Sequence, residues 1–325
     1  YDRRSVNPAR QQYATNECGQ YGAIYQPLST ATWQSINVLE KLAQFGDAEI
    51  PDRPLLEQTT QVYGAYARLL LGEGFCTAAI DLGPELSSPE VFELAEALFT
   101  DAIAGPDDDL RNMARVGRAR ARLNLGHHEG ALEDARAVPA GYVRNALYSS
   151  ASTRSQNEVY NRNNQVYGMS VEQRNPIFAG VADPRVASVN TGDLGPNGFD
   201  TVWVQLKYES LDAPIPIARY EEAQLIIAEI EGGQTAVDII NRLHDAAGIP
   251  HFTGGSEAEI QQHVIQERAR ELYLEGQRFW DIRRFEIPFD PPVGAQYPTG
   301  SFYGDTRCFP LPDLERDNNP NLQGG

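Results

Sequence analysis

The stretch from Gly117 to Pro139 limits the fold of this chain more than any other, and it reads GRARARLNLGHHEGALEDARAVP. Apolar and small residues recur at helical spacing up to Leu125, Gly126 interrupts the pattern, and a second helical segment then carries alanines and a leucine. Small side chains allow two helices to approach closely. The stretch therefore predicts two helices joined by a glycine turn.

The helical pattern covers most of the chain and predicts a mainly all-α fold. Segments near 55–82 and 88–104 form a looser version of the same pair, so we expect tetratricopeptide-like helical pairs. A stretch rich in Asn, Ser, Gly and Pro follows, in which Asp200 to Tyr208 predicts one short strand. We expect four regions: an extended N-terminal arm (1–28), tetratricopeptide-like helices (29–140), a loop-rich insert that is the candidate ligand region (141–217), and C-terminal helices with an extended tail (218–325).

Capping residues predict where several helices begin. Ser29 or Thr30 is expected to cap the first helix, in which Trp33, Ile36, Leu39, Leu42 and Phe45 form an apolar stripe. Ser88, followed by proline and glutamate, predicts a second cap. Ser256 is expected to cap a long helix to about Glu275, with a break at Gly276. Trp33 and Trp280 lie on helix stripes, which predicts that both are core residues.

The acidic composition narrows the class of ligand. The chain has 27 Lys and Arg against 45 Asp and Glu, a net charge of −18. Because binding to phosphates requires clustered cations, we exclude nucleic acid as a partner. Glycans and peptides remain as ligands. The sequence shows no phosphate-binding glycine loop and no metal-ligand motif, so we expect no cofactor and no metal.

The cysteines predict one disulfide in an oxidising compartment. Cys18, Cys76 and Cys308 allow one intramolecular bond and leave one thiol, and their spacing leaves open which two pair. The sequence begins at Tyr1, without Met or an apolar leader, as we expect of either a processed secreted chain or a trimmed one; the oxidising compartment follows from the first of these.

The segment from Glu267 to Phe285, ERARELYLEGQRFWDIRRF, has three interpretations: a reaction centre, a solvated face or a buried clamp. Acids one turn apart lie side by side, and each has an arginine nearby, namely Arg270 for Glu267, Arg278 for Glu275 and Arg284 for Asp281. A nearby cation lowers a carboxyl pKa, the wrong direction for a general acid. Exposed pairs contribute only about 0.3–0.5 kcal/mol, which does not account for the aromatic residues between them.

We therefore interpret the segment as a structural clamp, because arginine forks that join acids near aromatic rings are typical of half-buried networks between helices. No nucleophile-and-base motif occurs, and we expect no catalysis. The clamp is predicted to comprise Glu267, Arg268, Glu271, Glu275, Arg278, Trp280, Asp281 and Arg284.

The same segment resembles the C-terminal signature of SusD/RagB-type proteins. RYEEAQLIIAEI (Arg219 to Ile230) and FPLPDLERDNNPNL (Phe309 to Leu322) are similar to two further blocks of that family, in the same order. The helical pair near 117–139 lies where the family keeps its tetratricopeptide helices. The resemblance implies a non-catalytic protein at the outer-membrane surface of a Bacteroidota-like bacterium. Such a protein captures a glycan or peptide nutrient for a TonB-dependent, SusC-like transporter.

Ligand-binding candidates come from the loop-rich insert, because loops on a rigid scaffold carry recognition and aromatic rings stack on sugars. They are Tyr160, Asn161, Tyr167, Trp203 and Tyr208. The alternative is a secreted structural subunit that assembles with copies of itself into a filament or layer. It rests on the absence of a lipid-modified first cysteine, the odd cysteine count, the short insert and the terminal arms. Asp200-Thr201-Val202 also fits an O-glycosylation pattern at Thr201.

Overall fold

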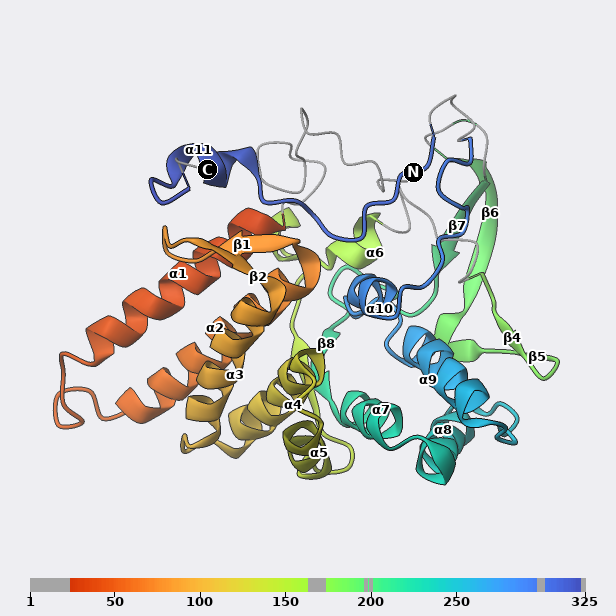
Figure 1. Cartoon of the computed structure of the whole chain (residues 1–325), viewed down its shortest axis with the longest axis horizontal. Helices are drawn as coiled ribbons and strands as arrows, with labels where there is room; N and C mark the ends of the chain where they lie inside the picture. The colour runs from red at the N-terminus through yellow and green to blue at the C-terminus, as the bar shows by residue number, and fades with distance from the viewer. Residues whose placement is uncertain (1–23, 163–173, 196–197, 199–200, 297–301, 323–325) are drawn as a thin grey trace. The chain divides into compact units, whose positions relative to one another are not determined.

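The computed structural model describes residues 24–162, 174–195, 198, 201–296 and 302–322. These residues form two compact units. One unit contains the described residues up to Tyr142 together with those from Thr306 onward, and the other spans Val143–Asp305. Figure 1 shows both as assemblies of helices with short two-stranded sheets. The prediction of a mainly all-α fold is confirmed.

The first unit is a succession of packed helices. Each helix contacts the next along the chain, as expected of tetratricopeptide-like pairs. Its elements are α1 (Tyr25–Leu42), α2 (Arg53–Gly74), β1 (Thr77–Ala79), β2 (Glu85–Ser87), α3 (Ser88–Ile103), α4 (Asp108–Leu125), α5 (His128–Arg136) and, from the tail, α11 (Asp313–Asn318). Strands β1 and β2 pair antiparallel.

Small residues set the spacing between helices in this unit. A Cβ added at Gly117 of α4 would lie 2.3 Å from the buried Phe99 ring of α3. Gly126 ends α4 with φ 77°, a left-handed conformation that favours glycine. The glycines of the predicted helical pair therefore allow the close approach and the turn.

Helix α1 presents a different face to the core than its apolar stripe predicts. Thr32 and Ser35 are buried, whereas Trp33 is 50% exposed. Ser35 lies against Gly64 of α2, where an added Cβ would be 2.5 Å away, and Arg68 donates a hydrogen bond to its hydroxyl. The prediction that Trp33 is a core residue is wrong, because close packing of α1 on α2 requires small side chains.

The C-terminal tail completes the core of the first unit. Phe309 pairs with the backbone at the end of α2, where Cys76 N–H donates to its carbonyl oxygen at 2.8 Å. Leu311 is 2% exposed and packs in a cluster with Tyr25 and Phe75. A Cys76–Cys308 disulfide fixes the two segments. The third cysteine, Cys18, lies outside the described residues.

The second unit combines the insert with the C-terminal helices. Three antiparallel strand pairs, β3–β8, β4–β5 and β6–β7, carry its loops. Helices α7, α8 and α9 pack on one another, and α10 contacts α9. Its elements are β3 (Val143–Ala146), α6 (Glu158–Arg162), β4 (Ile177–Phe178), β5 (Val181–Ala182), β6 (Ser188–Leu194), β7 (Thr201–Gln205), β8 (Ile215–Arg219), α7 (Tyr220–Glu231), α8 (Gly233–Ala247), α9 (Glu257–Glu271) and α10 (Arg278–Arg284).

The ends of α9 place the charged segment. Ser256 caps the helix in a capping box with Glu259, as the sequence predicts. The helix ends at Glu271, one turn earlier than expected, because Leu274 and Gly276 both have positive φ and turn the chain into α10. Ser87 caps α3, one residue before the predicted Ser88.

Within the described residues, no helix has the length and apolar content needed to cross a membrane.

Candidate functional site

The centre of the charged network is Arg219, the last residue of β8. Its guanidinium donates to Glu271 Oε1 at 2.6 Å and to both Glu275 oxygens at 2.9 and 3.0 Å. Lys207 donates to the same Glu275 carboxylate at 2.6 Å. The Glu275 side chain is only 3% exposed. One strand end therefore binds the segment that follows α9 through charge-assisted hydrogen bonds.

A second arginine joins the insert to α9. Arg185 lies in a 3₁₀ turn, Pro184–Val186, and forms a two-bond fork with Asp183 at 2.9 and 2.7 Å. The same guanidinium donates to Glu267 and to Glu271 Oε2, the latter at 2.9 Å. The carboxylates of Asp183 and Glu267 are fully buried.

A third group of ions joins α7, α9 and α10. Arg268 donates to both Asp281 oxygens at 3.0 and 3.1 Å, and Arg284 donates to Asp281 at 2.9 Å. Arg284 also forks onto Glu229 of α7. Asp281 is 1% exposed, so the charges are neutralised inside the fold. The interpretation of the segment as a buried structural clamp agrees with these contacts.

The pKa values of two clamp carboxyl groups, those of Glu267 and Asp281, argue against a catalytic role. Burial disfavours the charged form of Glu267, but hydrogen bonds from His244 and Arg185, with the charge of Arg185, hold the pKa of its carboxyl below the ordinary value. Burial acts likewise on Asp281, and the charges of Arg268 and Arg284 keep its pKa low. A general acid needs a raised pKa. These carboxylates are therefore held ionised as structural partners.

The partners of two clamp acids differ from those expected. Glu267 pairs with Arg185 rather than Arg270, and Glu275 pairs with Lys207 and Arg219 rather than Arg278. Those two expected pairings are wrong. The pairing of Asp281 with Arg284 is confirmed. Trp280 is half-buried, with the Arg283 guanidinium 5.1 Å from its ring centroid.

A pocket of about 490 Å³ lies beside the clamp, between α7 and α8. Tyr220, Gln224 and the exposed Arg242 line it together with the paired Arg219 and Glu271. Arg242 donates to Gln224 Oε1 at 2.8 Å. Glu271 reaches this pocket, but both of its oxygens accept hydrogen bonds from arginines, so its carboxylate is already paired.

The candidate ligand residues of the insert have separate surroundings. Tyr160 and Asn161 lie on α6 and are half-buried. Trp203 lies on β7, half-buried against Val186 and Tyr273. Tyr208 is 4% exposed, with its hydroxyl 3.4 Å from the Leu274 carbonyl oxygen.

The buried position of Tyr208 makes its assignment to a ligand surface wrong, because a ring enclosed by the fold cannot stack on a sugar. Tyr167 lies outside the described residues. Thr201 begins β7, and its O-glycosylation stays a prediction.

An exposed aromatic residue lies instead in the first unit. Trp33 lines a pocket of about 240 Å³ together with hydroxyl and carboxylate groups. The other lining residues are Ser29, Thr30, Asp81, Leu82 and Glu315. This site was missed in the sequence because Trp33 lies on the apolar stripe of α1, which predicts a core residue. The prediction that Ser29 or Thr30 caps the first helix is wrong, because α1 begins at Tyr25 and both residues lie inside it. Trp33 close to these two hydroxyl residues is the sequence signal for the pocket.

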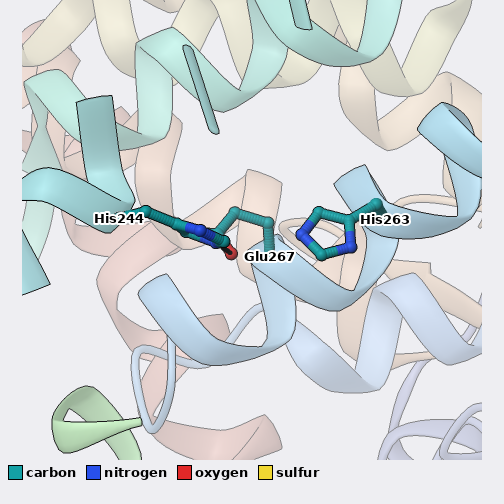
Figure 2. A group of neighbouring side chains, drawn as sticks. All are labelled: His244, His263 and Glu267. Atoms are coloured by element: carbon teal, nitrogen blue, oxygen red, sulfur yellow. Dashed lines mark hydrogen bonds and ion pairs between the residues drawn. The ribbon is translucent and has the colours of Figure 1, made fainter. Parts of the chain in front are cut away.

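Two histidines and one clamp acid form a further buried group. His244 of α8 and His263 and Glu267 of α9 place their donor atoms within 4.8 Å of one another. Figure 2 shows the Glu267 carboxylate at the edge of the His244 ring. Burial lowers the pKa of His263 to about 4, which keeps its ring neutral at neutral pH. Two imidazoles and a carboxylate are ligand types that bind transition metals.

The fold and the ion-paired network define a helical scaffold protein whose charged C-terminal segment holds its helices together. The chain belongs to the SusD family, whose model matches residues 144–323. The predicted resemblance is confirmed. The starch-binding protein SusD of Bacteroides thetaiotaomicron is 34% identical over 122 residues, which cover 34% of this chain and 21% of that protein. The match thus spans about a fifth of the length of this curated relative.

Solved structures share the fold at low sequence identity. A SusD-like carbohydrate binding protein from Bacteroides vulgatus superposes with a TM-score of 0.68 at 15% identity, covering 92% of this chain and 82% of the other. Surface glycan-binding protein A from Bacteroides uniformis gives 0.69 at 13% identity, with 96% and 86% covered. The protein of that name from Bacteroides thetaiotaomicron, in complex with laminarihexaose, gives 0.68 at 13% identity, with 92% and 84% covered.

Proposed function

We propose that this chain is a non-catalytic binding protein that captures a glycan at the outer-membrane surface of a Bacteroidota-like bacterium. The observation that carries the proposal is membership of the SusD family over residues 144–323. A relative in that family is named for starch binding, and a structure of the same fold holds laminarihexaose. The ion-paired clamp supports a binding role, because its carboxylates are held by arginines and lysine in the frame.

The Trp33 pocket is the surface that we assign to the glycan. A sugar ring presents an apolar C–H face and a polar hydroxyl edge, so it fits an exposed aromatic ring beside hydrogen-bonding groups. The indole of Trp33 is half exposed. Asp81 and Glu315 supply carboxylate acceptors for sugar hydroxyls, and Ser29 and Thr30 supply hydroxyls. The acidic lining favours a neutral glycan over an anionic one.

Calorimetric titration against a panel of neutral polysaccharides, including starch and laminarin, tests both the function and the site. Trp33→Ala should weaken binding by a factor between about two and ten, since an aromatic contact contributes roughly 0.5–1.5 kcal/mol. Phe45→Ala is the matched control, because Phe45 is 46% exposed near the end of α1 and does not line the pocket. No binding across the panel contradicts the function. Equal affinity in the wild type and Trp33→Ala contradicts the site.

Delivery to a TonB-dependent, SusC-like transporter is the second part of the proposal. Family membership supports it, and purification of the tagged chain from native outer membranes tests it. Recovery of a stoichiometric transporter is expected, and recovery of the chain alone contradicts this part. Self-assembly into a filament has no support from the described residues and is not proposed.

A further inference from the structure

The buried group of His244, His263 and Glu267 combines ligands from two packed helices. His263 and Glu267 are four residues apart on α9 and therefore lie on the same helix face. His244 reaches them from α8, which packs on α9. Metal sites in helical proteins are commonly built in this way from side chains on facing helices. Exposed fractions of 0% for His244, 7% for His263 and 0% for Glu267 place the group in the interior.

The hydrogen bonds of His244 assign its tautomer. Its Nδ1 lies 2.6 Å from the carbonyl oxygen of Pro250, and a carbonyl only accepts, so Nδ1 carries the proton. Its Nε2 lies 3.2 Å from Glu267 Oε2, within hydrogen-bond distance. A metal ion that binds here displaces the proton between Nε2 and Oε2 and bonds to both atoms. A backbone carbonyl that orients the other ring nitrogen is the usual support of a metal-binding histidine.

His263 adds a second unsatisfied ligand atom. Its Nε2 is buried and has no hydrogen-bond partner, which is costly for a polar atom inside a protein. The ring is held by parallel stacking on Phe252, with centroids 4.0 Å apart, and by edge contact with Phe178. The His263 nitrogen is therefore buried, oriented and unsatisfied, as expected of a metal ligand whose metal is absent.

Glu267 can serve the clamp and a metal together. Its Oε1 accepts from Arg185, and its Oε2 accepts a longer hydrogen bond from Arg185, at 3.3 Å, while it also faces His244. Arg185 is also neutralised by Asp183 and Glu271, so its charge is shared among three carboxylates. A carboxylate has about four acceptor positions, which leaves Oε2 able to coordinate.

We propose that His244, His263 and Glu267 bind a divalent transition-metal ion, of which Zn²⁺ is the best match, as a structural link between α8 and α9. Two imidazole nitrogens and one carboxylate oxygen suit Zn²⁺, whereas Ca²⁺ and Mg²⁺ prefer oxygen ligands. Bonds of about 2.0–2.2 Å require the ligand atoms to draw closer together than 4.8 Å. The ion replaces the proton between His244 Nε2 and Glu267 Oε2 by two metal bonds and satisfies the unpaired His263 nitrogen.

Zinc titration of the chelator-treated full chain tests the proposal, with competition by a chromophoric chelator as the readout. The wild type should bind one Zn²⁺, and His263→Ala should bind it at least about 100-fold more weakly, since even outer partners of a metal site contribute 10–100-fold. His251→Ala is the control and should match the wild type, because its side chain is 57% exposed and pairs with Asp245. A wild type that binds no Zn²⁺, or a His263→Ala variant that binds it equally, overturns the proposal.

Cobalt gives a readout that does not depend on the folding of a variant. Co²⁺ bound to the wild type should show the strong visible absorption of a four- or five-coordinate site with nitrogen ligands. An unchanged spectrum of hydrated Co²⁺ overturns the proposal.

Nitrogen-15 imidazole spectra of the five histidines should show two shifted by Zn²⁺. A His244 ring that keeps protons on both nitrogens in saturating Zn²⁺ means that a proton bridges it to Glu267, which also overturns the proposal.

Discussion

Replacing Arg219 by methionine tests whether the clamp holds the second unit together. The substitution keeps a long side chain and removes three charge-assisted hydrogen bonds to the Glu271 and Glu275 carboxylates. Those carboxylate side chains are 12% and 3% exposed. Removing one partner of a buried ion pair costs roughly 3–5 kcal/mol, because the other charge stays in the interior.

The structure places the expected cost near the lower end of that range. Glu275 keeps Lys207 at 2.6 Å, and Glu271 keeps Arg185 at 2.9 Å, so neither carboxylate is left without a cation. We therefore expect Arg219→Met to lower the free energy of unfolding by about 3 kcal/mol. Arg219→Lys should lose less, since it keeps the charge but not the fork that engages two acids at once.

Urea unfolding followed by the fluorescence of Trp203 and Trp280 is the assay, because both lie in the same unit as Arg219. Asp245→Asn is the control, since it alters a surface contact with His251 in which the histidine and aspartate side chains are 57% and 68% exposed. That control should change the free energy of unfolding by less than about 0.5 kcal/mol. An Arg219→Met variant as stable as Asp245→Asn would refute the clamp as a source of stability.

Three further predictions concern other parts of the fold. The pKa of Asp281 is low in the folded state, so its stabilising contribution is complete above its unfolded pKa near 3.9 and disappears as pH falls through the folded value. The difference in free energy of unfolding between the wild type and Asp281→Asn, measured by urea unfolding, should therefore shrink below about pH 4. Gly117→Ala should cost about 1–3 kcal/mol by forcing a methyl group into the Phe99 ring, whereas Gly74→Ala, with no atom within 4 Å, should melt at or slightly above the wild-type temperature. Replacing both bonded cysteines by serine should lower the free energy of unfolding of the first unit by about 2–5 kcal/mol, because the bond closes a 232-residue separation. A double variant with the wild-type denaturation curve would contradict this expectation, and a Gly117→Ala variant with the wild-type melting temperature would contradict the previous one.

Local signals in the sequence are sufficient for single helices and for the membership of the clamp. The Ser256 cap predicts the start of α9, because a capping box is read from four adjacent residues. The acids and arginines of the clamp lie within one motif, so their role follows from their crowding. Their partners could not be predicted, since Arg185 and Lys207 come from loops 82 and 68 residues away from Glu267 and Glu275.

The exposure of Trp33 could not be predicted, for a different reason. Periodicity assigns the apolar face of α1 to the core, but contact with α2 selects Thr32 and Ser35, whose small size matters more than their polarity. The proximity of the buried histidines could not be predicted either, because His244 and His263 lie on different helices and their spacing in the sequence matches no metal motif.

The return of the tail to α2 fixes the order in which the first unit can mature. Leu311 and Phe309 enter a core whose other members are made more than 200 residues earlier, and the Cys76–Cys308 bond spans the same interval. A ribosome or a translocation channel delivers the chain from its N-terminus, so the early helices emerge with that core still lacking its last layer. Maturation of this unit therefore waits until the segment that starts at Thr306 has been made, and a chain cut short before Thr306 would leave apolar surface exposed to chaperones and proteases.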